Sequence, residues 1–456
     1  MASLDSNIVT IALPRISSDL SAGFSYLAWV ITGYLIALVA LVIFFGKMSD
    51  VYGKKRIYVT GFVFFAASSA LCGLSQNITE LIAFRIIQGG SAALFFAVSR
   101  PILLDAFPPN EISFAFGVNT ATSSMGAVLG PVVGGLLVAI DWRLIFYVNV
   151  PIAVLASALA IRDIPAGLKQ VSPRKALESF NPLSSGLFVL TASLAMVWLT
   201  FYNPVVGVLG LVSLLPLVVS EVRSRNPLLN RELRANRVFV YSLFAVIVLT
   251  IGYNGIAFAM SFYFQSVVNL KPALSGILIA PVSLTVGIGS VIAGRIYGRL
   301  KDPIRLSILG ALTCGAGMAL LGLAVGIEAH SWTVEAALCV VGFSGGLYWV
   351  PLVTTAMRSS RLETIGITSA TFTMFAQISS AISITVTVAI SAYYLPHSLA
   401  SQVYSGGLVN LTSVQGGLLK KGIEDALIVL GVLNLAGIPF LFQAMKEQKT
   451  GPGSAG

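Results

Sequence analysis

The feature of this chain that most restricts its fold is a series of long apolar runs separated by short polar segments. A helix needs about 17 to 25 apolar residues to cross the hydrocarbon core of a bilayer. Thirteen runs of this kind predict an all-α integral membrane protein. They lie near residues 25–46, 57–75, 79–104, 112–140, 143–161, 183–201, 204–221, 238–266, 273–294, 304–326, 332–357, 366–395 and 423–443.

Composition excludes the main soluble alternatives. With 56% hydrophobic and 10% charged residues, a chain of 456 residues has too little polar surface to cover a soluble globule. The net charge of +10 does not indicate nucleic-acid binding, because the basic residues separate the apolar runs and form no stripe with aromatic residues. We therefore expect membrane lipid as a partner, and no nucleic acid.

A shorter apolar segment occupies residues 1–16 and ends near Pro14. At a rise of about 1.5 Å per residue it would be about 24 Å long, shorter than a hydrocarbon core of about 30 Å. Counted as a first span, it raises the prediction to fourteen transmembrane helices. The first of these would be truncated, with a native start upstream of Met1.

The distribution of basic residues predicts the orientation. Cytoplasmic loops of membrane proteins are enriched in Lys and Arg, and fourteen spans with both termini in the cytoplasm place most of the 28 basic residues inside. The protein is therefore expected in the plasma membrane, as a multi-pass monomer. The basic residues that this layout does not place inside are Arg15, Arg85, Arg143, Lys271, Lys420 and Lys421.

A polar segment at 46–56, GKMSDVYGKKR, joins two apolar runs and is predicted to be a loop that changes shape during function. Gly46 would let helices approach closely, and Asp50 would lie by a helix N-terminus. The cluster of Lys54, Lys55 and Arg56 would face an anionic lipid surface.

A weak copy of this segment begins at Gly294, eight spans later, whereas two six-span halves would place it six spans later. Two inserted spans at 183–221 explain the difference. The predicted domains are a six-helix bundle at 1–161, a linker with two extra helices at 162–237, a second bundle at 238–443 and a cytoplasmic tail at 444–456. The connection at 395–422 is predicted to lie outside.

Five segments of the first third resemble motifs of the major facilitator superfamily, in its family of 14-span drug:proton antiporters. They are LDSNIVTIALP at 4–14, GKMSDVYGKKR at 46–56, RIIQGGSAA at 85–93, GAVLGPVVGG at 126–135 and WRLIFYVNVP at 142–151. The resemblance implies two six-helix bundles plus two inserted helices. It also implies proton-coupled export of small amphipathic or cationic compounds by alternating access.

Two charged residues are predicted within the spans, Asp5 and Arg85. An ionisable group in hydrocarbon is costly unless it faces a wet cavity or a partner, so Asp5 is predicted to bind a proton and a cationic substrate in alternation. If Met1 is the native start, the alternative is that Asp5 is an exposed charge among the lipid headgroups. For Arg85 the resemblance implies a part in proton transfer. A structural role, with its guanidinium bonded to backbone carbonyls, remains an alternative.

The resemblance gives roles to two further groups. The conformational switch would be formed by Gly46, Asp50, Gly53, Lys54 and Arg56. The antiporter motif would be formed by Gly126, Gly130, Pro131, Gly134 and Gly135, whose small residues allow close packing while the proline bends the helix.

Aromatic and amide residues are candidates for lining a cavity for apolar or cationic compounds. Where the family commonly has an arginine and glycines in its thirteenth span, this chain has FAQISSAIS at 375–383, which leaves the substrate class open. The candidates are Gln88, Tyr253, Asn254, Phe258, Tyr348, Trp349, Phe375 and Gln377.

Other functions are less compatible with the sequence. A dedicated exporter of one metabolite, such as a siderophore or antibiotic, and a facilitator without proton coupling remain alternatives. No Walker A motif for ATP and no domain-sized polar stretch is present. The two histidines lie in polar connections and the three cysteines in apolar runs, so no enzyme site, cofactor or metal is expected.

Overall fold

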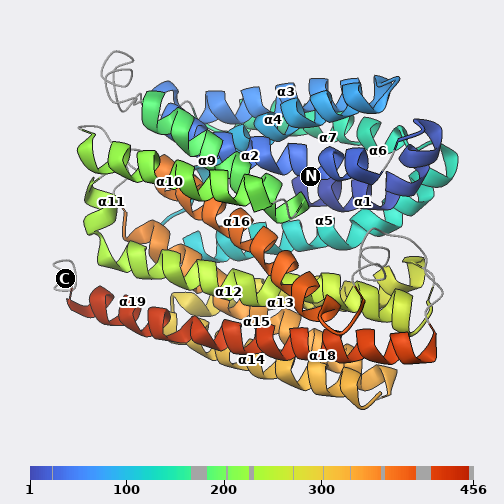
Figure 1. Ribbon diagram of the computed structural model, residues 1–456. Helices are drawn as coiled ribbons and strands as arrows, with labels where there is room; N and C mark the ends of the chain where they lie inside the picture. The colour runs from blue at the N-terminus through green and yellow to red at the C-terminus, as the bar shows by residue number, and fades with distance from the viewer. Residues whose placement is uncertain are drawn as a thin grey trace. The chain divides into compact units, whose positions relative to one another are not determined.

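The computed structural model describes residues 1–22, 24–165, 182–201, 204–224, 231–270, 272–300, 302–328, 330–360, 365–396 and 412–450. All secondary-structure elements in these ranges are helices (Figure 1). The helices of the first half are α1 (Ala2–Asp19), α2 (Phe24–Tyr52), α3 (Lys54–Leu74), α4 (Ile78–Ala106), α5 (Ile112–Ile140), α6 (Leu144–Tyr147), α7 (Asn149–Asp163), α9 (Pro182–Phe201), α10 (Pro204–Arg223) and α11 (Arg231–Ala235). The second half contains α12 (Arg237–Phe262), the π-helix η1 (Tyr263–Val267), α13 (Pro272–Tyr297), α14 (Ile304–Gly326), α15 (Ser331–Arg358), α16 (Ile365–Ala392), α18 (Ser413–Ala436) and α19 (Ile438–Thr450).

Each of the thirteen predicted runs contains a helix. Among the described residues, 12 helices are long and apolar enough to cross a membrane, while α1 and α9 contain only shorter apolar stretches. The chain is therefore a multi-pass membrane protein. The count of fourteen spans and the truncation of the first are not confirmed and stay predictions.

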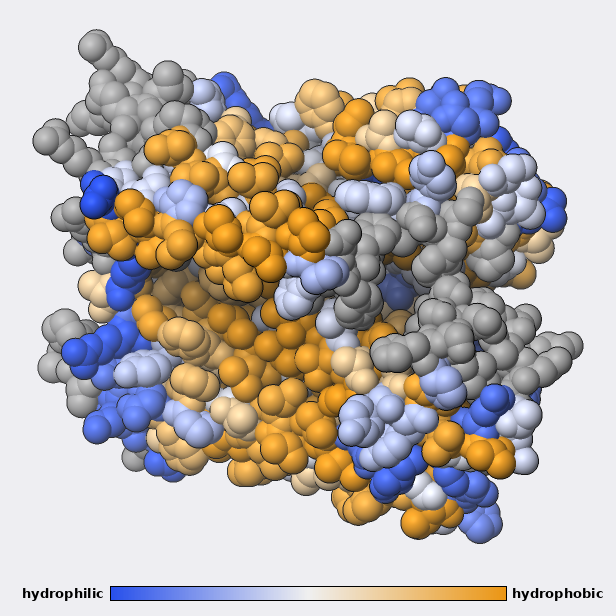
Figure 2. Space-filling view, viewed as in Figure 1, coloured by the Kyte–Doolittle hydropathy of each residue, from blue (hydrophilic) through white to orange (hydrophobic). Residues whose placement is uncertain are grey.

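Exposed side chains along the helices are largely apolar. On α10, Leu211 and Leu215 are 68% and 69% exposed. Hydrophobic residues cover most of the face drawn in Figure 2, and hydrophilic residues lie mainly near its margins. Exposing such a surface to water costs free energy, whereas lipid tails are apolar and can surround it without that cost.

The chain forms two compact units. Unit 1 comprises residues 1–109, 132–240 and 357–378, and unit 2 comprises residues 110–131, 241–356 and 379–456. In unit 1, α3 packs against both α4 and α7, and α9 packs against α10 and α2 (Figure 1). The predicted bundles at 1–161 and 238–443 are contiguous segments, whereas both units are discontinuous, and these boundaries stay predictions.

Glycines mark a packing pattern that recurs in both units. A Cβ on Gly46 of α2 would lie 2.9 Å from the carbonyl oxygen of Gly366, at the start of α16 in unit 1. A Cβ on Gly294 of α13 would lie 2.5 Å from the carbonyl oxygen of Ser113, at the start of α5 in unit 2. The original segment and its predicted weak copy thus each begin at a glycine that closely approaches the backbone of another helix. The internal repeat itself stays a prediction.

The predicted loop at 46–56 is mostly helical, so this prediction was wrong. Helix α2 continues to Tyr52 and α3 begins at Lys54, which leaves Gly53 alone between them. Gly53 has a φ of 93°, a conformation that glycine adopts without steric cost and that lets one residue separate two helices. The side chain of Asp50 lies outside the described part of the chain.

Two predicted segments near the C-terminus contain helix, and their bounds as a connection and a tail stay predictions. Helix α18 begins at Ser413, inside the predicted outer connection at 395–422, because Thr412 and Gln415 form a capping box there. The predicted tail at 444–456 is helical as far as Thr450. Near its end, Lys449 Nζ lies 2.9 Å from Asp302 Oδ2.

Candidate functional site

Asp5 and Arg85 form a buried ion pair in unit 1. Asp5 lies in the first turn of α1 and Arg85 on α4, and Arg85 Nη1 donates to Asp5 Oδ2 over 2.8 Å. Their side chains are 0% and 1% exposed. An ionised carboxylate or guanidinium is tolerated in such a place only when it is paired and hydrogen-bonded. The sequence predicted that Asp5 would need either a wet cavity or a partner, and the structure shows the partner, Arg85.

Two amides complete the surroundings of the Asp5 carboxylate. Asn149 Nδ2 of α7 donates to Asp5 Oδ1 over 2.8 Å, and Gln88 Nε2 of α4 lies 3.4 Å from the same oxygen. Gln88, predicted as a cavity residue, is fully buried here. Both carboxylate oxygens therefore have donors, and side chains of two helices, α4 and α7, hold the one negative charge of α1.

The polar network continues into α3. Gln88 Nε2 donates to Ser69 Oγ over 3.1 Å, and Ser69 Oγ donates to the backbone oxygen of Phe146 over 2.8 Å. Cys72 Sγ lies 3.7 Å from Gln88 Oε1, as a weak donor. Cys72 is buried and free, as predicted, but it contacts a polar side chain as well. The network connects α1, α3, α4, α6 and α7.

The other side of the Arg85 guanidinium faces aromatic rings. Its Cζ lies 4.4 Å from the centroid of the Tyr34 ring and 5.9 Å from that of Phe146. Arg85 Nε also donates to the backbone oxygen of Val30 over 3.1 Å. The guanidinium therefore makes a backbone hydrogen bond, of the kind expected for a structural role, in addition to its ion pair. These contacts attach α4 to α2.

Several residues of this site were missed in the sequence. Phe146 and Asn149 stand in the segment 142–151, where a motif was recognised without a site role being given to its members. Tyr34 and Ser69 follow no motif, and only the packing of α2 and α3 on α4 brings them to Arg85 and Gln88.

The basic cluster after Gly53 makes mainly contacts within the protein. Lys54 Nζ lies 2.7 Å from Asp105 Oδ2, at the end of α4. Lys55 Nζ donates to the backbone oxygen of Ile161 over 2.6 Å. Arg56 is exposed. The lysines thus connect the start of α3 to the ends of α4 and α7, and of the three Arg56 is the most available to lipid.

The five residues of the predicted antiporter motif lie on α5. Gly126 and Gly130 are buried, and the helix continues through Pro131, whose side chain is outside the described part. A Cβ on Gly134 would lie 3.0 Å from Ile8 Cγ1 of α1, whereas a Cβ on Gly135 would meet nothing within 4 Å. Gly134 thus places α5 against the helix that carries Asp5.

The difference in free space at Gly134 and Gly135 predicts the effects of substituting each of them. Gly134→Val is expected to lower transport about tenfold, because the added methyl groups would displace Ile8 and with it Asp5. Gly135→Val introduces the same side chain where there is space, so its initial rate should stay within about twofold of the parent. Rates are to be measured in liposomes at equal protein content. Equal loss in both variants would contradict the role of the Gly134 contact.

The remaining predicted cavity residues do not form one cluster within either unit. In unit 2, the Tyr253 and Tyr348 rings meet edge to face with centroids 6.2 Å apart, while Asn254 Nδ2 donates to the Thr250 oxygen of its own helix. Phe258 packs on Phe262 of the same helix. Trp349 lies in unit 2, whereas Phe375 and Gln377 lie in unit 1, and all three are half-buried. Their role as a lining stays a prediction.

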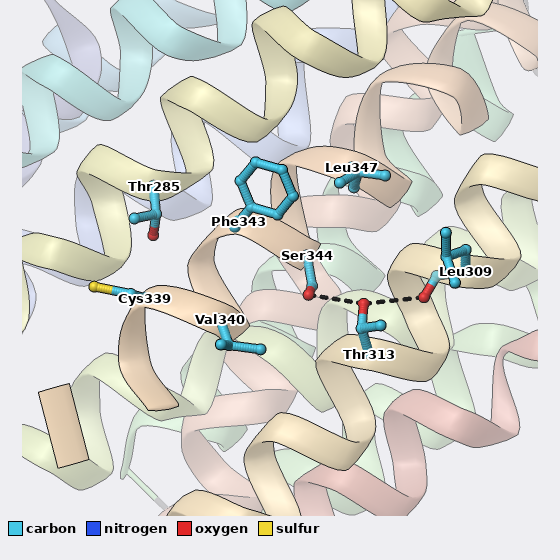
Figure 3. Close-up of a pocket in the computed structure, with 8 residues that line it drawn as sticks. All are labelled: Thr285, Leu309, Thr313, Cys339, Val340, Phe343, Ser344 and Leu347. Carbon is cyan, nitrogen blue, oxygen red and sulfur yellow. Dashed lines mark hydrogen bonds between the residues drawn. The ribbon is translucent and has the colours of Figure 1, made fainter. Parts of the chain in front are cut away.

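A separate apolar pocket lies between α13, α14 and α15 in unit 2, with a volume of about 430 Å³ (Figure 3). On one side Thr313 Oγ1 donates to Ser344 Oγ over 2.8 Å. The pocket contains no charged side chain and none of the predicted site residues. It is lined by Thr285, Leu309, Thr313, Cys339, Val340, Phe343, Ser344 and Leu347.

The chain is similar to bacterial transporters. Multidrug transporter protein MdtP of Bacillus subtilis is 27% identical over 398 residues, which cover 84% of this chain and 72% of the relative. The probable actinorhodin transporter of Streptomyces coelicolor is 27% identical over 400 residues, covering 84% and 69%. These relatives indicate a transporter of small molecules rather than an enzyme.

The fold is similar to that of solved transporters. The structure of the proton:xylose symporter XylE, bound to 6-bromo-6-deoxy-D-glucose, matches with a TM-score of 0.66 at 14% identity and covers 96% of this chain and 92% of that one. A family model of the Major Facilitator Superfamily matches residues 1–384. Because this match covers more than half of the sequence, the chain belongs to the Major Facilitator Superfamily.

Proposed function

We propose that this protein is a proton-coupled exporter of small amphipathic or cationic compounds, of the multidrug efflux type, that works by alternating access. The observation that carries the proposal is the buried pair of Asp5 and Arg85. A charge pair inside a membrane helix bundle is costly and is commonly kept for ion or substrate movement. The names of the relatives, multidrug and actinorhodin transporters, support drug-like small molecules as the substrates.

The coupling we infer is an exchange of partners at one carboxylate. Asp5 is held by Arg85 in this conformation. A proton on Asp5 would remove the charge that holds the guanidinium, and a cationic compound would compete for the same charge. Because one carboxylate cannot satisfy a proton and a cation together, the two would bind in alternation, which is the requirement for antiport.

The switch and the topology are part of the same proposal. The contact of Gly46 with α16 and the ties of Lys54 and Lys55 to α4 and α7 would change between the two conformations. Asp50 would set the rate of this change by interacting with a helix N-terminus.

We further propose that the chain has fourteen spans in the plasma membrane with both termini in the cytoplasm, and that it is a monomer.

A dedicated exporter of one metabolite is the second candidate. It is favoured by the similarity to the probable actinorhodin transporter. The same coupling site would serve both functions, and the two differ in the range of compounds that are moved. A panel of unrelated cationic dyes would all be substrates of a multidrug exporter, and few or none would be substrates of a dedicated one.

The test is dye accumulation in liposomes containing the purified protein. We expect ethidium, whose charge does not depend on pH, to accumulate in liposomes that are acidic inside, because protons leaving the lumen would drive the dye inward. Nigericin should abolish the accumulation, and protein-free liposomes should show none. Protein-dependent ethidium flux that only equalises concentrations, with or without the pH gradient, would instead identify a facilitator.

A further inference from the structure

The space around the Arg85 guanidinium has the chemistry of a cation-binding site. Its hydrogen-bond partners are all acceptors: the Asp5 carboxylate, the Gln88 side-chain oxygen at 2.7 Å and the backbone oxygen of Val30. Its remaining neighbours include the ring faces of Tyr34 and Phe146. We call these five groups, without Arg85 itself, the cation cage.

We propose that the cation cage is a substrate subsite that Arg85 fills in this conformation and that an organic cation fills when Arg85 leaves it. This inference rests on the proposed export of cationic compounds. It assigns Tyr34 and Phe146 a role in substrate binding, and it makes Arg85 a competitor of the substrate.

Charge and geometry support one occupant at a time. The cage without Arg85 carries the single negative charge of Asp5, so one monovalent cation neutralises it and a second would leave an uncompensated positive charge. All five groups are buried; Asp5 and Gln88 are 0% exposed and Tyr34 is 2% exposed. A cation can therefore enter only after the guanidinium has moved out.

The aromatic rings would act through their faces. The Tyr34 hydroxyl is buried and has no hydrogen-bond partner within the described residues, so its ring face over the guanidinium is the contact the structure shows. A cation over an aromatic face away from water is attracted to the negative face of the ring. That preference extends to ammonium and amidinium groups of organic compounds as well as to arginine.

The acceptors would add a preference for cations with N–H groups. Gln88 Oε1 accepts from Arg85 Nη1, and its other donor among the described residues is the weak Cys72 thiol. A quaternary ammonium ion has no donor to replace Nη1, so it would leave this buried oxygen and the Asp5 carboxylate short of hydrogen bonds. We therefore assign the cage to protonated amines, amidines and guanidines.

The first experiment removes the resident cation and supplies a free one. Purified Arg85→Ala is heated in detergent with methylguanidinium chloride or, at equal concentration, tetramethylammonium chloride. Methylguanidinium should raise Tm by about 2 °C more than tetramethylammonium, because a ligand that binds the folded state stabilises it. The parent protein, whose cage is filled, and Arg15→Ala, which removes an exposed cation of α1, should not distinguish the two salts.

A second measurement uses a variant that keeps the buried pair. Lysine lacks the planar guanidinium and should be a weaker occupant of the cage. Ethidium has a quaternary ring nitrogen, but its two exocyclic amines supply N–H donors, so Arg85→Lys should bind it at least about threefold more tightly than the parent in a fluorescence titration. No gradient is applied in either experiment, so loss of coupled transport would leave this inference standing. Equal responses to the two salts in Arg85→Ala, or unchanged or weaker ethidium binding in Arg85→Lys, would overturn it.

Discussion

Asp5→Asn is expected to abolish ethidium accumulation driven by a pH gradient. Asparagine keeps the shape of aspartate but has no carboxylate to exchange a proton for Arg85 or for a cation. Asp5→Glu should retain part of the transport with a shifted pH dependence, because the carboxylate survives at a displaced position. Both rates are to be measured in liposomes at equal protein content.

The structure adds that Asp5→Asn should also lower stability. Arg85 would remain buried without its counter-ion, and breaking a buried pair from one side costs about 3–5 kcal/mol. The double variant Asp5→Asn with Arg85→Gln removes both charges, so it should recover much of the lost Tm while transport stays absent. Asp19→Asn, which breaks an exposed pair on the same helix, should change stability by less than about 1 kcal/mol.

Two outcomes would contradict this account. Uphill accumulation by Asp5→Asn would place the coupling acid elsewhere. Glu335 and Asp425, near the predicted outer ends of later spans, would be the next candidates to be replaced. A double variant no more stable than Asp5→Asn alone would show that the buried pair is not the source of the lost stability.

Gly89→Ala is expected to have a comparably large effect although it changes no charge. A Cβ on Gly89 of α4 would collide with the backbone of Tyr34 on α2, and a backbone cannot move aside as a side chain can. The helices would have to separate, which costs about 1–3 kcal/mol and displaces the Tyr34 ring from Arg85. We expect loss of most transport and a lowered Tm.

The adjacent glycine provides the matched control. A Cβ on Gly90 would meet only Leu41 Cδ1, at 3.2 Å, and the end of a leucine side chain can shift. Alanine also favours helix over glycine by about 1 kcal/mol, so Gly90→Ala should equal or exceed the parent in Tm and transport at a similar rate. If Gly89→Ala retained the parent's Tm and rate, the close approach of α2 and α4 would not be required.

The sequence predicted where helices form more reliably than where they end. Hydropathy is a property of consecutive residues, so every predicted span contains a helix. The segment at 46–56 is polar like a loop, yet the conformation of Gly53 allows helix on both sides of one residue. The start of α18 depended on the capping box at Thr412, a local signal that hydropathy does not contain.

The site was predicted in part. Asp5 and Arg85 could be selected because charges within apolar runs are rare, and Gln88 was named as a cavity residue. Their mutual contact could not be derived, since it depends on how α1 and α4 rotate about their axes when they pack. The same rotation decides that Gly134 contacts Ile8 while Gly135 faces open space, although both belong to one motif.

The sequence alone thus determined the membrane class, the helical spans and the two charges that the interior must accommodate. The tertiary structure decided what surrounds those charges: Tyr34, Phe146 and Asn149 approach them from three other helices. Hydrophobicity acts on each segment separately, and a segment of suitable length inserts as a helix whatever its neighbours are. Ion pairs, amide contacts and ring faces act over a few ångströms, so they are settled only when the helices have packed against one another.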